Sequence, residues 1–248
     1  MSIYAARVLD AWAPSTMTRA IRIERPPEIT FVASQATRLI LGGDLARPMT
    51  IASGPARPYL DFAVQRTASE FKRAFFGLAP GDTVQITAPR GHFLLDRERP
   101  AAMIASGIGV TPFRSMLQAL ADENATLSGA IVHATHGPID VPFRDELEAL
   151  ARRTGLRLSR ENGPVDEVQL RTLASEIAGP VWYIAGPVED VKHVRELLGS
   201  IGVGKEDIRL ESFRYAGRLA SPSLPVWTPD WNQVSRGAAG EEMPWHYP

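Results

Sequence analysis

The stretch that decides the fold class of this 248-residue chain is AAMIASGIGVTPF, residues 101–113. Ala101–Ala105 is a short apolar run, and a glycine-rich turn leads from it into a segment with the spacing of a helix. Thr111 is the predicted N-cap, and Pro112 suits the first helical position, where its missing N–H costs nothing. A strand, a glycine turn and a helix in this order are typical of a βαβ unit.

The same rhythm continues downstream. Further apolar runs that predict strands stand at 129–134, 156–159, 181–185 and 208–212. Between them lie segments with apolar residues three and four apart, one of which is stopped by Gly155. This alternation predicts an α/β domain with a parallel sheet, which we place at residues 99–218.

The first hundred residues follow a different period. Leu60, Phe62 and Val64 alternate with other residues, and similar two-residue patterns occur at 18–25, 36–41 and 84–86. Short strands punctuated by proline and glycine predict an antiparallel barrel or sandwich over residues 1–98. One short helix is expected at Ser69–Phe76, with Ser69 as its cap.

The last segment, residues 219–248, has no clear period and is rich in proline. It is either a partly disordered tail or a tail that packs over a flat apolar surface. Three tryptophans in so short a segment favour packing, because their rings are costly to leave in water.

Composition narrows the classes of protein. The net charge of −1 argues against nucleic-acid binding through phosphate contacts. The absence of cysteine excludes disulfides and thiolate-held iron–sulfur clusters, so electrons would have to be carried by an organic cofactor or a metal with other ligands. Residues 1–25 have no apolar core like that of a signal peptide, and no run approaches the ~20 apolar residues of a membrane helix. We expect a cytoplasmic protein without membrane insertion.

Charge is distributed unevenly along the chain. Through Pro100 there are 13 basic and 9 acidic residues, a net of +4, whereas the remainder has 14 and 19, a net of −5. This asymmetry is either chance scatter or the mark of a basic first domain that attracts an acidic partner.

Three segments could carry chemistry. The turn at Gly107 and Gly109 could bring backbone amides to an anion at a helix N-terminus, although tight packing explains the pattern as well. In RPMTIASG, residues 47–54, Arg47 could hold a phosphate and Thr50 could bond a ring heteroatom, or the segment is a strand with a solvated arginine. Gly186-Pro187 ends a strand at the same sheet edge as Gly107, or is an ordinary connection.

Together and in this order, these segments resemble the ferredoxin–NADP reductase superfamily, which includes flavodoxin reductases and oxygenase reductases. Residues 47–53 look like its Arg-x-Tyr-Ser/Thr flavin strand, and 106–112 look like its Gly-Gly-Ile-Gly-Ile-Thr-Pro turn. The turn at 185–187 is similar to its Cys/Ala-Gly-Pro, and 211–213 is similar to its closing Glu-x-Phe. The likeness covers roughly residues 3 to 217.

The resemblance implies a Greek-key FAD barrel, a nicotinamide-nucleotide domain that takes NADPH or NADH, and catalytic roles for Thr50 and Glu211. It implies flavin contacts along the strand and at the helix that follows, from Arg47, Pro48, Met49, Thr50, Ile51, Ser53, Phe62, Val64, Ser69 and Lys72. It implies nucleotide contacts from Gly107, Gly109, Thr111, Pro112, His136, Gly186 and Pro187.

Several positions depart from the family pattern. Met49 stands where the family has a ring-stacking tyrosine, and a thioether packs on a ring more weakly. Trp245 or Tyr247 could supply the missing aromatic from the tail. His136 falls where an arginine often reads the NADP 2′-phosphate, which leaves NADPH and NADH both open. A metal site at His133 and His136 is not expected, because residues three apart on a strand face opposite ways.

The leading hypothesis is an NAD(P)H-dependent FAD oxidoreductase that passes electrons to an acidic carrier protein such as ferredoxin or flavodoxin. The first alternative is a reductase that treats free flavin as a substrate. The second is a flavin- or nucleotide-binding interaction protein without turnover.

Overall fold

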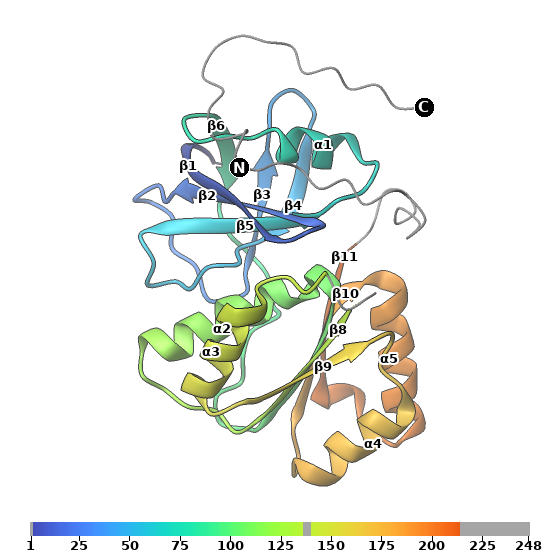
Figure 1. Cartoon of the computed structure of the whole chain (residues 1–248). Helices are drawn as coiled ribbons and strands as arrows, with labels where there is room; N and C mark the ends of the chain where they lie inside the picture. Colours follow the sequence, from blue (N-terminus) through green and yellow to red (C-terminus); the bar gives the residue numbers. More distant parts are fainter. Residues whose placement is uncertain (1, 136–139, 214–248) are drawn as a thin grey trace.

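The computed structural model describes residues 2–135 and 140–213. The chain forms two sheets in two adjoining parts of the molecule, an antiparallel sheet from the first part of the chain and a parallel sheet flanked by helices from the second (Figure 1). The predicted two-domain architecture is confirmed.

The first sheet is six-stranded, with the order β4-β3-β6-β1-β2-β5. Its elements are β1 (Ile3–Ser15), β2 (Thr18–Glu24), β3 (Ala36–Ile40), β4 (Ala46–Thr50), β5 (Tyr59–Gln65), α1 (Glu70–Phe76) and β6 (Thr83–Thr87). The two edges of the sheet approach each other just past β4, where the Ala52 amide donates to the Asp61 carbonyl at 2.8 Å. This contact gives the sheet its barrel-like closure.

The alternating residues of β2 and β5 point into the barrel, where Ile21, Ile23, Leu60 and Phe62 are fully buried. The sequence pattern does not reveal β1, the longest strand of the sheet. Its sequence does not alternate between apolar and polar residues, because the outward-facing positions include the apolar Ile3 and Leu9, which are 56% and 44% exposed.

The second sheet has five parallel strands in the order β11-β10-β7-β8-β9. Its elements are β7 (Ala101–Ser106), η1 (Gly107–Val110), α2 (Thr111–Asp122), β8 (Gly129–Thr135), α3 (Arg144–Thr154), β9 (Arg157–Asn162), α4 (Glu167–Glu176), β10 (Val181–Pro187), α5 (Val188–Ser200), η2 (Lys205–Asp207) and β11 (Ile208–Phe213). Helices α2 and α3 cover one face, and α4 and α5 cover the other (Figure 1). The strand order reverses between β7 and β10, and ligands of such sheets bind beyond the strand ends at this point.

Two predicted helix caps differ from the structure. Val110 precedes α2, because the 3₁₀ turn η1 runs directly into the helix. Thr111 is already helical, and its hydroxyl donates to the Ile108 carbonyl at 3.1 Å, so the N-cap prediction is wrong. Ser69 does occupy the cap position of α1, but its side chain makes no capping hydrogen bond.

Besides the core of the barrel, one apolar cluster is shared by residues of both sheets. Ala20, Ala63 and Phe93 from the first part of the chain pack with residues of β7, β10 and α2. All residues of α2 from Thr111 to Ala121 are buried, because one side of the helix lies on the parallel sheet and the other on the barrel. The connection between the sheets is bonded to this core, since the Asp96 amide donates to the Tyr183 hydroxyl at 2.7 Å.

We predict that Tyr183→Phe lowers the free energy of unfolding by about 1–2 kcal/mol, because the Asp96 amide loses its acceptor. Denaturant unfolding measures the change. Tyr4→Phe is the matched control, since Tyr4 is half-buried and its hydroxyl makes no hydrogen bond within residues 2–135 and 140–213. Equal losses in the two variants would contradict the assignment.

Candidate nucleotide and flavin site

The glycine turn lies at the carboxyl end of β7, beside the end of β10. Gly107 has a φ of +52°, a conformation that favours glycine. A Cβ on Gly109 would stand 2.1 Å from the Ala185 carbonyl oxygen, so only glycine lets η1 pack this closely on β10. Packing therefore explains Gly109 by itself, and the turn also places the N-terminus of α2 at the sheet edge where anions bind.

The side chain of His133 is hydrogen-bonded to the glycine turn. It lies on β8 with 1% exposure, and its Nε2 is 2.9 Å from the Gly107 carbonyl oxygen. Burial lowers the pKa of His133 from 6.5 to about 4. The ring is therefore neutral at pH 7, and Nε2 carries the hydrogen because its partner is a carbonyl oxygen. This geometry gives His133 a structural role, since its ring bonds the main chain of the turn.

The end of β10 completes this edge of the sheet. Gly186 and Pro187 are the last residues of the strand, and α5 begins directly after them. The Ser106 hydroxyl donates to the Asp190 carboxylate, which joins the end of β7 to the first turn of α5. Ser106 stands where the turn that it resembles has glycine, and a glycine there has no hydroxyl to make this bond.

The expected flavin strand is β4, an edge of the antiparallel sheet. Arg47 and Pro48 are exposed, Met49 is half-buried, and Thr50 is buried. The Arg47 guanidinium donates to the Ala46 carbonyl at 2.8 Å and lies 5.9 Å from the ring centroid of Phe71 on α1.

Thr50 provides the test of whether this strand suits a flavin. Its Oγ1 is buried and has no hydrogen-bond partner within the described part of the chain. A buried hydroxyl without a partner costs free energy, and a heteroatom of a flat ring laid against the edge strand would satisfy it. The residues present therefore fit a flavin ring.

Other residues of the predicted flavin set have different surroundings. The side chains of Ile51, Phe62 and Val64 pack in the barrel core. The Ser53 hydroxyl accepts from the Asp61 amide at 3.0 Å and donates to the Tyr59 carbonyl at 3.3 Å, so it braces β5. Cofactor contacts of these residues stay predictions, and they would have to involve the main chain.

A lysine with a lowered pKa lies on α1. Burial lowers the pKa of Lys72 from 10.5 to about 8. Its ammonium group is half-buried, and an anion beside it would stabilise the charged form. A pyrophosphate contact of Lys72 stays the prediction that the family resemblance implies.

Glu211 lies on β11, opposite Ala185 of β10 in the sheet register. It is half-buried, and burial raises the pKa of its carboxyl group above the ordinary value. No hydrogen bond or ion pair of this carboxyl is found within residues 2–135 and 140–213. A catalytic role of Glu211 stays a prediction.

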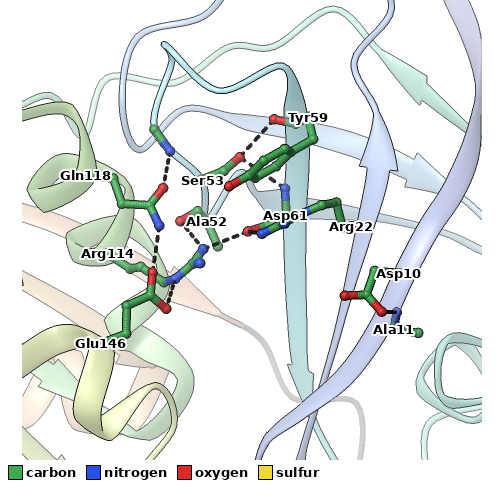
Figure 2. A network of polar contacts seen from close by, with 11 residues as sticks. Asp10, Ala11, Arg22, Ala52, Ser53, Tyr59, Asp61, Arg114, Gln118 and Glu146 are labelled. Atoms are coloured by element: carbon green, nitrogen blue, oxygen red, sulfur yellow. Dashed lines mark hydrogen bonds and ion pairs between the residues drawn. The ribbon is translucent and has the colours of Figure 1, made fainter. Parts of the chain in front are cut away.

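Sequence reasoning missed a polar network where α2 meets the barrel. Figure 2 shows Arg114, Gln118 and Glu146 of the α/β domain beside Ala52 and Asp61 of the barrel. The signal in the sequence is slight: two polar side chains one helical turn apart on a helix with a strong apolar face.

Three residues of the predicted site, His136, Trp245 and Tyr247, lie outside the described residues. No group of three or more metal-ligating side chains occurs in the described ranges. None of the helices in those ranges is both long and apolar enough to span a membrane.

An edge strand whose Thr50 hydroxyl has no partner within the described residues, together with a glycine turn at the switch point, fits the class of two-domain oxidoreductases that bind a flavin and a nicotinamide nucleotide. Residues 103–196 match the family described as "Oxidoreductase NAD-binding domain". Ferredoxin–NADP reductase B of Sorangium cellulosum (strain So ce56) is 33% identical over 241 residues, which covers 85% of this chain and 97% of that protein. The chain therefore belongs to the ferredoxin–NADP reductase superfamily.

Two solved structures have the same fold. A cytochrome P450 reductase from Amycolatopsis has a TM-score of 0.75 and 22% identity, with coverage of 87% of this chain and 71% of that one. A ferredoxin NADP+ reductase from Neisseria gonorrhoeae with bound FAD and NADP has a TM-score of 0.72 and 18% identity, with coverage of 86% and 99%. FAD and a nicotinamide nucleotide, the cofactors expected from the sequence, are those of the superfamily.

The lowered pKa of His133 predicts a pH dependence of stability. Above pH 6.5 the histidine is neutral in both folded and unfolded chains, and its contribution is complete. As the pH falls towards about 4, the unfolded chain takes up a proton that the folded chain refuses, so the free energy of unfolding falls by up to about 3 kcal/mol.

His133→Gln keeps a donor for the Gly107 carbonyl but does not titrate, so we expect a flatter fall in stability between pH 6.5 and 4. Denaturant unfolding at a series of pH values measures it. His193→Gln, at an exposed histidine of α5, is the control and should leave the slope as in the wild type. An unchanged slope in His133→Gln would refute the buried neutral histidine.

Proposed function

We propose that this protein is an NADPH-dependent FAD oxidoreductase that delivers electrons to an acidic carrier protein such as ferredoxin or flavodoxin. The observation that carries the proposal is the contact between the helix that follows the glycine turn and the segment that follows strand β4. Arg114, on the helix that begins at the glycine turn, donates to the carbonyl of Ala52, two residues beyond Thr50, at 2.8 Å. A nucleotide at the turn and a flavin on β4 would be held by directly bonded elements.

Bound FAD would accept a hydride from the nicotinamide and release electrons singly or as a pair. The role of this chain is to bind and orient. The Thr50 hydroxyl would donate to the flavin ring, Arg47 would hold flavin phosphate, and Ser69 and Lys72 would bind the pyrophosphate.

The nucleotide side uses main-chain groups. Amides of the turn from Gly107 to Pro112 and the end of β10 at Gly186 and Pro187 hold the nucleotide. The half-buried Glu211 carboxyl lies opposite Ala185 of β10, and it would take the catalytic role that the family resemblance implies.

NADPH is favoured over NADH by positive charge at the neighbouring strand end. Arg160 of β9 is opposite His133 in the sheet register and lies 3.1 Å from Glu148. Its guanidinium also donates to the Arg144 carbonyl at 3.3 Å. The positive charges of both arginines contribute to the lowered pKa of His133. Two arginines at this edge suit a 2′-phosphate, and the relative from Sorangium cellulosum is named for NADP.

The acceptor is proposed from charge. The net charge of +4 up to Pro100 makes the flavin-side domain attractive to an acidic protein. The domain division at 1–98, 99–218 and 219–248, like the cytoplasmic location, is part of this proposal.

A second candidate is a reductase for which free flavin is the substrate. The half-buried Met49 favours it, because a thioether at the ring-stacking position holds a flavin less firmly than tyrosine does. Gel filtration separates the two functions: a bound cofactor stays with the protein, whereas a flavin substrate leaves it.

We predict that the purified protein, loaded with FAD, shows flavin absorption bands that bleach anaerobically on addition of NADPH, and more slowly with NADH. Re-oxidation by an added ferredoxin or flavodoxin tests the acceptor. A protein that takes up no FAD contradicts the proposal and points to an interaction protein without turnover.

We predict that Thr50→Val leaves the stability unchanged or higher, because the hydroxyl has no partner in the described structure, yet weakens FAD binding about tenfold. Fluorescence titration with FAD measures the affinity, and Thr50→Ser should retain it. The matched control is Thr37→Val on the next strand, where the hydroxyl donates to the Thr87 carbonyl at 2.5 Å. There we expect a loss of about 1–2 kcal/mol in stability and no loss of flavin affinity.

A further inference from the structure

The network between α2 and the barrel centres on Arg114, which has 3% exposure. Its Nη1 donates to the Ala52 carbonyl at 2.8 Å and to the Asp61 carboxylate at 3.1 Å, and its Nε donates to Glu146 at 2.9 Å (Figure 2). One side chain thus bonds the segment after β4, strand β5 and helix α3. The cation also lies 4.7 Å from the ring centroid of Phe143.

Three consecutive barrel residues are bonded to α2. Besides Ala52, the Ser53 carbonyl accepts from the Ser115 hydroxyl at 2.7 Å. The Gly54 amide donates to the Gln118 side chain at 2.8 Å. The segment that continues β4 is therefore held in register along one side of the helix that starts at the glycine turn.

Charge is balanced within the network. Asp61 has 1% exposure and also receives two bonds from Arg22, at 2.8 and 3.1 Å, while the Arg22 cation lies 3.5 Å from the ring centroid of Tyr59. Apolar residues of similar volume often stabilise a protein as well as a buried ion pair does, because charges are costly to remove from water. The charged network instead fixes the relative positions of its members, because the planar guanidinium group of an arginine bonds its acceptors in a restricted geometry.

From this placement we infer that Arg114 is a positioning residue for hydride transfer. It touches neither proposed cofactor site. It fixes the spacing between Thr50, two residues before Ala52, and the turn at Gly107–Val110, which ends directly before α2. The inference rests on the proposed function. Reacting atoms must approach to about 3–3.5 Å, and a displacement near 1 Å can slow the reaction about 100-fold.

The test is anaerobic stopped-flow reduction of the FAD-loaded protein at increasing NADPH concentration, which separates the limiting rate from the nucleotide affinity. In Arg114→Gln we expect the limiting rate to fall about 10- to 100-fold with the affinity within about threefold of wild type. Arg114→Lys keeps the positive charge but lacks the planar guanidinium group, so its limiting rate should lie between those of Arg114→Gln and the wild type. Asp61 keeps its bonds to Arg22 in both variants, which favours folding.

The matched control is Arg57→Gln. Arg57 also ties the barrel to α2, through Asp122 at 2.6 Å, but at the end of the helix remote from the glycine turn. Its limiting rate should stay within about threefold of wild type. A limiting rate in Arg114→Gln equal to that of the control, or a loss of affinity alone, overturns the inference.

A second readout does not depend on flavin chemistry. Amide hydrogen exchange of residues 52–54 should be at least about tenfold faster in Arg114→Gln than in wild type, and unchanged in Arg57→Gln. If wild-type protein fails to reduce flavin, the proposed function is wrong, and the exchange data still decide whether Arg114 fixes this segment. Unchanged exchange in Arg114→Gln overturns the inference in either case.

Discussion

The buried guanidinium of Arg114 is the constraint on which the arrangement of the two sheets depends. It satisfies acceptors from the segment after β4, from β5 and from α3 at once. Losing any of these partners would leave a charge or a carbonyl buried without a bond, which is far more costly than the net gain from forming one. The apolar core holds the layers together, whereas this network decides how they are aligned.

The alignment of the two sheets brings the glycine turn and the edge strand β4 into a fixed relative position. A glycine turn at the switch point of a parallel sheet is common to many nucleotide-binding proteins, and an edge strand is common to many barrels. In this protein the two are joined through helix α2, whose side chains Arg114, Ser115 and Gln118 bond the segment that follows β4. The Thr50 hydroxyl, which has no partner within the described residues, lies on one side of this contact, and the turn bonded to His133 lies on the other.

Buried groups with shifted pKa values have separate tasks in this site. His133 is neutral because of burial and serves the main chain of the turn, so its charge is irrelevant to a ligand. Lys72 and Glu211 are only half-buried, and the shifts in their pKa values come from lost hydration. A ligand phosphate beside Lys72, as the proposed function has it, would favour the charged form that burial disfavours.

The sequence by itself determined the two architectures, because the period of apolar residues reports local backbone geometry. It also located the glycine turn and indicated the family, and it predicted which strand would hold a flavin. It did not reveal β1, whose exposed Ile3 and Leu9 disturb the alternation, nor the cap of α2, which depends on η1. Only the tertiary structure decided the partners of Arg114, Ser115 and Gln118 and left Thr50 without one among the described residues, since a local pattern shows which residues are buried but not which distant element covers them.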